Sequence, residues 1–340
     1  MIWLTLRQHR GQVVGLVALA LLLTVAVWVV ADYALRTRAE LGVDACLTSG
    51  GPSPIFGPCF DVFAEFQRRL GLLSWLFIAI WVAPFLVASF IGGPLFAVEF
   101  ERATHRLAWT QGISRLRWAW LKLGIVLAVA LVAALILAAA AAPSRVLMGI
   151  GRSGAGVRPF DGFDLEAPAL VSYVLFGIVV AAFIGAWSRR ILVGMFVGLL
   201  VFGIARVAVY TVRPWYQAPV TVPYESLSRV YVVHPGDPTP PDQIPNDAWI
   251  IDVPAVDAEG QPVPRERVNS LLNEYHRGGV VSIGRQSDST YLEEHGIFRR
   301  AGYQPADRYW TFQAIEAAIF TALAALFAFL TLWRVRTRDA

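Results

Sequence analysis

The chain contains 340 residues, of which 56% are hydrophobic and 16% are charged, and its mean hydropathy is +0.54. Soluble globular proteins usually carry about 25% charged residues, so this chain has too few charges to cover a water-soluble body of its size. Its 29 basic and 25 acidic residues give a formal net charge of +4, which is too balanced to indicate a nucleic-acid partner. The composition predicts an integral membrane protein and excludes a disordered chain, collagen and a disulfide-rich secreted module.

Six apolar stretches follow one another along the chain, and each could cross the bilayer as a helix of about 20 residues. The predicted transmembrane helices are residues 13–34, 70–98, 119–142, 169–187, 191–212 and 310–334. A cleaved signal peptide is the alternative for the first stretch, but its apolar run is longer than such peptides usually have. The predicted fold class is therefore an all-α polytopic membrane protein, with residues 1–11 and 335–340 flanking the six helices.

The basic residues near the ends of these helices predict the orientation of the chain. Twelve Arg and Lys residues fall on the side of the two termini, whereas seven fall in the short loops on the opposite side. Basic residues are enriched in short cytoplasmic segments, so both termini are predicted to be cytoplasmic.

The two cysteines agree with this orientation. Cys46 and Cys59 both lie in the first loop predicted to be outside, and the chain has no other cysteine. A disulfide between them is chemically reasonable in an oxidising compartment, and two free thiols are the alternative.

Residues 213–309 form a long extracytoplasmic segment between the fifth and sixth predicted helices. Residues 249–253 and two other short runs, 229–233 and 280–283, are typical of strands, whereas residues 265–275 have the apolar spacing of a helix. The pattern predicts a small α/β insertion. It could be a structured spacer or a lid that binds substrate.

The segment after the second predicted helix carries a dense run of charged and aromatic side chains. Glu99, Arg102 and Arg106 fall on one helical face, with no proline and only Gly112 among the residues that follow. The spacing predicts an amphipathic helix at the inner membrane surface, although any interfacial helix would have a similar pattern.

Short polar and proline-containing stretches stand near the ends of the predicted helices. They are Gly93-Pro94-Leu95, Glu99-Phe100-Glu101, residues 104–111, Arg117-Trp118, the loop from Cys46 to Cys59, Arg213-Pro214-Trp215-Tyr216, and residues 303–316. In combination they resemble the membrane subunits of actinobacterial ABC-2-type transporters, and the resemblance covers nearly the whole chain. Pro58, before Cys59, departs from the acidic or small residue that often stands there.

The resemblance implies a permease of six helices in an ABC-2, type V exporter-like bundle in the bacterial cell membrane. It implies a homodimer, with a second copy of the chain, that docks on a separately encoded ABC ATPase and exports a hydrophobic drug, antibiotic or peptide. Residues 1–11 would be an amphipathic connecting helix on the lipid surface. Coupling to the ATPase would fall on Glu99, Glu101, Arg102, Thr104, His105, Arg106, Trp109 and Gln111.

ATP and Mg are expected on the partner subunit, and no cofactor, metal or catalytic residue is expected in this chain. The sequence contains no Gly-x-x-x-x-Gly-Lys-Ser/Thr phosphate-binding loop, and its five histidines form no His-Glu-x-x-His pair. The chain is therefore predicted to be a transporter subunit rather than an enzyme. A non-transporting membrane sensor or assembly protein, whose external domain binds a ligand, is the alternative.

Arg206 and Glu316 are ionisable residues inside predicted membrane helices, where such side chains require partners. Counted along their helices, they lie at similar depths of roughly 9–10 Å below the outer surface. We predict that they form an ion pair across the fifth and sixth helices or across the dimer. The alternative is that Arg206 extends to the interface and Glu316 meets water.

Overall fold

The computed structural model describes residues 10–48, 59–104, 114–149, 159–223, 244–245, 247–277 and 288–337. These residues belong to two compact units. The first is helical and is drawn from residues 1–154, 161–213 and 310–340, and the second is drawn from residues 155–160 and 214–309. The predicted connecting helix, apart from its last two residues, and the predicted strands at 229–233 and 280–283 lie outside the described residues.

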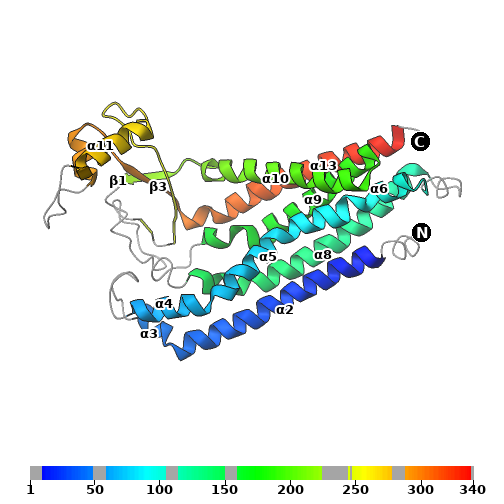
Figure 1. Cartoon of the computed structure of the whole chain (residues 1–340), viewed down its shortest axis with the longest axis horizontal. Helices are drawn as coiled ribbons and strands as arrows, with labels where there is room; N and C mark the ends of the chain where they lie inside the picture. The colour runs from blue at the N-terminus through cyan, green and yellow to red at the C-terminus, as the bar shows by residue number, and fades with distance from the viewer. Residues whose placement is uncertain are drawn as a thin grey trace. The chain divides into compact units, whose positions relative to one another are not determined.

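The first unit is a bundle of long helices that alternate in direction (Figure 1). Its elements are α2 (Arg10–Glu40), α3 (Val43–Thr48), α4 (Phe60–Arg69), α5 (Gly71–Val87), η1 (Ala88–Gly92), α6 (Pro94–Glu101), α8 (Arg115–Gly149), η2 (Pro159–Leu165), α9 (Ala167–Ser188), α10 (Ile191–Val212), η3 (Arg213–Trp215) and α13 (Tyr309–Thr337). Within the described ranges, six helices are long and apolar enough to cross a membrane, which confirms the prediction of six spans.

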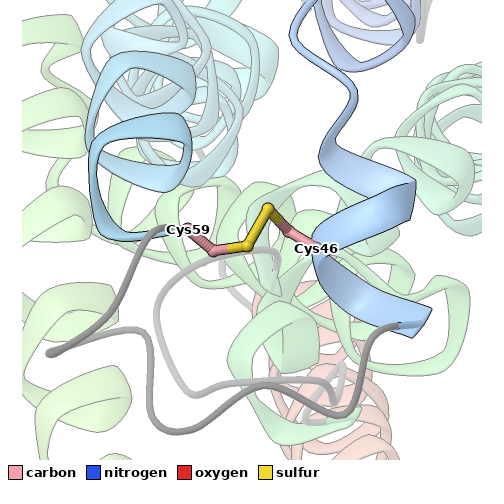
Figure 2. Close-up of a disulfide and its surroundings, with 2 residues drawn as sticks. All are labelled: Cys46 and Cys59. Carbon is pink, nitrogen blue, oxygen red and sulfur yellow. A yellow bond between two sulfur atoms is a disulfide. The ribbon is translucent and has the colours of Figure 1, made fainter.

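The two ends of the bundle can be told apart by what they carry. Helix α2 begins and α13 ends at the same end, which we call the terminal end (Figure 1). At the opposite end, the predicted disulfide is present: Cys46 in α3 is bonded to Cys59, just before α4 (Figure 2). We call this the disulfide end. There Glu65 of α4 binds Arg68 and Arg69, and these hydrogen bonds lower its pKa to about 2.

The second span, predicted at residues 70–98, is not one continuous α-helix. It consists of α5, the π-helical turn η1 and the short helix α6. Pro94 has no backbone N–H and cannot continue the α-helical pattern. Gly93 N instead donates to Ala88 O at 3.1 Å, five residues earlier, which is the spacing of a π-helix.

Glycines allow three helices to approach closely at this break. A Cβ atom added to Gly93 would lie 2.7 Å from Met195 N of α10, and one added to Gly194 of α10 would lie 2.8 Å from the Cα of Gly185 in α9. Similarly, a Cβ at Gly198 would lie 2.7 Å from the Cα of Ala181. Small residues at such crossings are typical of helix packing in membranes. Helices α6, α9 and α10 are therefore held backbone against backbone.

The second unit has a small antiparallel sheet with strand order β1-β3-β2 among the described residues. Its elements are β1 (Val220–Pro223), β2 (Trp249–Ile251), α11 (Arg265–Arg277), α12 (Asp288–Glu294), β3 (Arg300–Gln304) and η5 (Ala306–Arg308). Val222, Ala301 and Tyr303 are buried in its core, and Gln304 donates to the backbone oxygens of Pro214 and Gln217. Sheet and helices together make the small α/β unit that the sequence predicts.

Candidate functional site

A buried ion pair joins two helices near the terminal end of the bundle. Lys122 Nζ of α8 donates to Glu99 Oε1 of α6 at 2.6 Å, and the two residues are 2% and 4% exposed. Phe96 of α6 and Trp118 of α8 lie beside the ammonium group, with ring centroids 5.5 and 5.2 Å from Nζ. The pair is thus enclosed by aromatic rings, which exclude water and strengthen its electrostatic attraction. The ion pair joins α6 to α8 close to the segment that connects these two helices.

The next carboxylate along α6 binds a different helix. Glu101 Oε2 accepts a hydrogen bond of 3.0 Å from Ile191 N, the first residue of α10. The first N–H groups of a helix have no partner inside the helix, and the N-cap residue, Arg190, supplies no side-chain hydrogen bond. A carboxylate also suits the positive end of the helix dipole. Glu101 therefore caps α10 from a distance of 90 residues in the sequence.

Helix α6 ends at Glu101, within the segment for which the sequence predicts an amphipathic helix. Arg102, Ala103 and Thr104 form an exposed turn in which Ala103 has a φ of 56°, a left-handed conformation. His105, Arg106, Trp109 and Gln111 lie outside the described residues. Of the residues predicted to couple to an ATPase, Glu99 is buried and bound to Lys122, whereas Glu101, Arg102 and Thr104 are exposed. The side chain of Glu99 consequently faces the bundle.

A second group of charges lies at the disulfide end, where α10 ends and α13 begins. Arg206 of α10 and Glu316 of α13 are brought together, with Nη1 3.4 Å from Oε1. Arg206 is 5% exposed and Glu316 is fully buried. The guanidinium also lies 3.6 Å from the ring centroid of Tyr173 in α9, a cation–π distance.

Arg213 makes the shorter contacts in this group. Its Nε and Nη2 donate to the two carboxylate oxygens of Glu316, each at 2.7 Å, so the pair is bidentate. Nη2 also donates to Asp164 Oδ1 of η2 at 2.6 Å. The Tyr173 hydroxyl is within hydrogen-bonding reach of both Asp164 and Glu316. We call Asp164, Tyr173, Arg206, Arg213 and Glu316 the charge cluster.

The charge cluster ties three helices together without leaving a net charge. Two guanidinium groups from α10 and η3 face one carboxylate from η2 and one from α13, while Tyr173 adds a hydroxyl from α9. One turn from Glu316, the buried Gln313 donates to Phe163 O and accepts from Ala169 N. These bonds join α9, α10 and α13 to one another at the disulfide end. They provide no nucleophile activated by a base, and the described residues contain no group of ligands suited to a metal.

The sequence interpretation missed three members of the charge cluster and the partner of Glu99. Arg213 stands seven residues after Arg206, about two helical turns further on and just past the end of the predicted helix, which is a signal that could have joined them. Asp164 lies in a connection and Tyr173 inside a predicted span, and neither position carries a comparable signal. Lys122 is the single lysine in the chain, and only the structure reveals its burial against Glu99.

Six apolar helices with internal ion pairs and a broken second span define a multi-pass membrane protein. The model of the family described as "ABC-2 membrane transporter related" matches residues 16–213, which is more than half of the chain. The chain belongs to this family, and it is an ABC-2-type permease, a class that generally works with an ABC ATPase. No curated protein and no solved structure matches the chain.

Proposed function

We propose that the chain is the membrane-spanning subunit of an ATP-driven ABC exporter in a bacterial cell membrane. Family membership over residues 16–213 carries this proposal, because the matched region includes five of the six spans and the segment after α6. A separate ATPase subunit would bind ATP and Mg and drive the cycle. Hydrophobic drugs, antibiotics and peptides are the proposed cargo.

The proposed orientation places the terminal end in the cytoplasm. The excess of basic residues at that end supports it, as does the disulfide at the other end, because disulfides persist in oxidising compartments. The exposed turn at 102–104 would then lie where a cytoplasmic ATPase can reach it.

A second copy of the chain is proposed as a further partner. Helix α10 exposes a row of large apolar side chains at spacings of three and four residues, which is one helical face. They are Leu192, Phe196, Leu200, Ile204 and Val207. In a membrane such a row packs against lipid or against the same row of a second subunit.

Purification of the tagged chain from its native membranes tests the proposal. We expect an ABC ATPase to co-purify and to hydrolyse ATP, and inverted vesicles to accumulate ethidium, a hydrophobic cation used as a probe, only when ATP is present. Arg102→Glu should reduce the amount of co-purified ATPase, because it reverses a charge in the exposed turn. Arg336→Glu is the matched control, since it makes the same change at an exposed position of α13 near the terminal end.

Two results would contradict the proposal. One is a complex without an ATPase, which would favour the sensor or assembly protein. The other is an equal loss of ATPase in both variants, which would show that the turn has no special part in docking.

A further inference from the structure

An apolar groove runs along the first turns of α2, a helix at the edge of the bundle (Figure 1). Its volume is about 380 Å³. The residues that line it are Gly11, Gly15, Leu16 and Leu19 of α2, Leu86 and Val87 of α5, and Phe90 and Ile91 of η1. Phe90 and Leu86 are 62% and 44% exposed and form its rim, whereas Leu16 and Val87 are buried and form its floor. We call it the α2 groove.

Two glycines leave space on the α2 side of this groove. A Cβ atom added to Gly11 or Gly15 would meet nothing within 4 Å among the described residues. Gly93 and Gly194, at the break in the second span, are different because each lies against the backbone of a neighbouring helix. Glycine is a poor helix former, and in membrane helices it typically marks a close approach of another helix. Gly11 and Gly15 have no such contact and instead leave room beside α2.

The α2 groove leads to a small void beneath α2. The void has a volume of about 30 Å³ and shares Leu16, Leu19 and Val87 with the groove. It extends to Leu23 of α2, and it is lined only by apolar side chains of α2, α5, α8 and α9. Such a cavity stays dry, because water finds no hydrogen-bonding partner in it. An apolar group can fill the void, whereas water cannot.

The length and depth of this path match one leaflet of a bilayer. From Gly11 to Leu23 the path follows about 12 residues of α2, or about 18 Å. One leaflet contributes about 15 Å, which is half of a hydrocarbon core of about 30 Å. The path begins at the terminal end, where Arg10 is the first residue of α2. Basic residues at a membrane surface attract anionic headgroups.

We propose that the α2 groove binds one acyl chain of an anionic phospholipid. The headgroup lies at the terminal end, and the methyl end of the chain points towards Leu23. The lining side chains offer no hydrogen-bond donor or acceptor, so the groove selects a hydrocarbon chain over a peptide or another polar molecule. The bound chain fills the space between α2 and η1 and completes the packing of the first span. This site does not depend on an ATPase or on transport.

The open glycine positions allow the groove to be filled by substitution. Gly15→Leu places a side chain in the open space, and leucine forms helices more readily than glycine. Gly124→Leu in α8 is the matched control. Gly124 also meets nothing within 4 Å, and it lines neither the groove nor the void.

Photolabelling with a lipid probe tests the site. The purified full-length chain is placed in phosphatidylcholine vesicles that contain a small fraction of phosphatidylglycerol with a diazirine near the end of one acyl chain. After irradiation, mass spectrometry locates the adducts. Leu16, Leu23 and Val87 are decisive, because these residues are only 5–6% exposed and the surrounding bilayer does not reach them.

We expect adducts at these buried residues in the parent chain and in Gly124→Leu. Gly15→Leu should lose them, while adducts on the exposed row of α10 stay the same in all three proteins. A phosphatidylcholine probe with the same diazirine should label the buried residues less, because its headgroup has no net charge.

Three results would overturn the inference. The first is labelling confined to exposed residues, and the second is labelling of the buried residues that persists in Gly15→Leu. The third is a covalent dimer formed on oxidation of Gly15→Cys, which would show that a second copy of the chain covers the groove. Equal labelling by the two probes would overturn the assignment of an anionic lipid.

Discussion

At the scale of single residues, the charge cluster shows why ionisable groups can remain inside an apolar bundle. Arg206 and Arg213 balance Asp164 and Glu316, and Tyr173 supplies a further hydrogen-bonding group. Removing one member of a buried ion pair leaves the other without compensation, which typically costs about 3–5 kcal/mol. The free energy of such a cluster therefore depends on its charge balance as well as on the length of each contact.

The contact lengths predict an order of importance within the cluster. Arg213→Leu should lower stability by about 3–5 kcal/mol, because it breaks the bidentate contact with Glu316 and leaves a net negative charge. Arg206→Leu should cost less, since its closest ionic contacts are 3.4 and 3.5 Å. Adding Glu316→Gln to Arg213→Leu restores the balance, so the double variant should lose less than the sum of its parts. Denaturation midpoints of the purified variants measure these differences.

Arg36→Leu is a suitable control for that series. Arg36 and Asp32 form an exposed pair on α2 at the same end of the bundle, and exposed pairs contribute about 0–1 kcal/mol. Additive losses for Arg213 and Glu316, or a larger loss for Arg206→Leu than for Arg213→Leu, would contradict the assigned order.

How much of this site the sequence could reveal depends on the kind of signal. Arg206 and Glu316 stand out because a charge in an apolar run is conspicuous, and counting residues along two helices gives their depths. Arg213 was placed at the edge of a loop, and Asp164 lies in a connection whose path the sequence does not fix. Glu101 was assigned to ATPase coupling through the resemblance, and its hydrogen bond to a backbone N–H 90 residues later leaves no pattern in the sequence from which it could be predicted.

At the scale of elements, hydropathy predicts the long helices well because each is a sustained apolar run. Helix α10 matches its predicted bounds. The interior of the second span was harder to predict, since apolar content does not report whether the backbone is α-helical or π-helical. Strand β3 was missed for a related reason. Its sequence, Arg-Ala-Gly-Tyr-Gln, lacks alternation, and it becomes a strand by pairing with β1 and β2 on both sides.

The glycine contacts lead to a prediction about helix packing. Gly198→Ala should lower stability by about 1–3 kcal/mol, because the new methyl group would overlap with Ala181 on the facing helix. Gly124→Ala in α8 is the matched control. It meets nothing within 4 Å and should be neutral or stabilise the helix by up to about 1 kcal/mol. Thermal denaturation of the two purified variants makes the comparison, and an equal effect would show that α9 and α10 do not pack this closely.

At the scale of the whole molecule, the boundary between the two units follows the sequence closely but not fully. The second unit includes most of the predicted segment 213–309, together with residues 155–160, which the prediction assigned elsewhere. Phe160 explains their inclusion, because its ring stacks on Trp249 of β2 at 5.1 Å and meets Tyr309 at 5.4 Å. Contacts of this kind join segments distant in sequence and cannot be predicted from local composition.

The disulfide provides a test of how the whole molecule is oriented in the membrane. In intact cells, a membrane-impermeant maleimide should label no native cysteine until an impermeant reductant opens the Cys46–Cys59 bond, because the proposed orientation places this bond outside. A cysteine introduced by Arg336→Cys should be labelled only after permeabilisation. Labelling of Arg336→Cys from outside would show that the orientation is the reverse of the proposed one. A cytoplasmic ATPase could then not reach the turn at 102–104.

The Cys46–Cys59 bond spans 13 positions, and closing a loop of this size typically stabilises a protein by about 3 kcal/mol. Replacing both cysteines with serine should therefore lower the denaturation midpoint without changing the orientation of the Arg336→Cys marker.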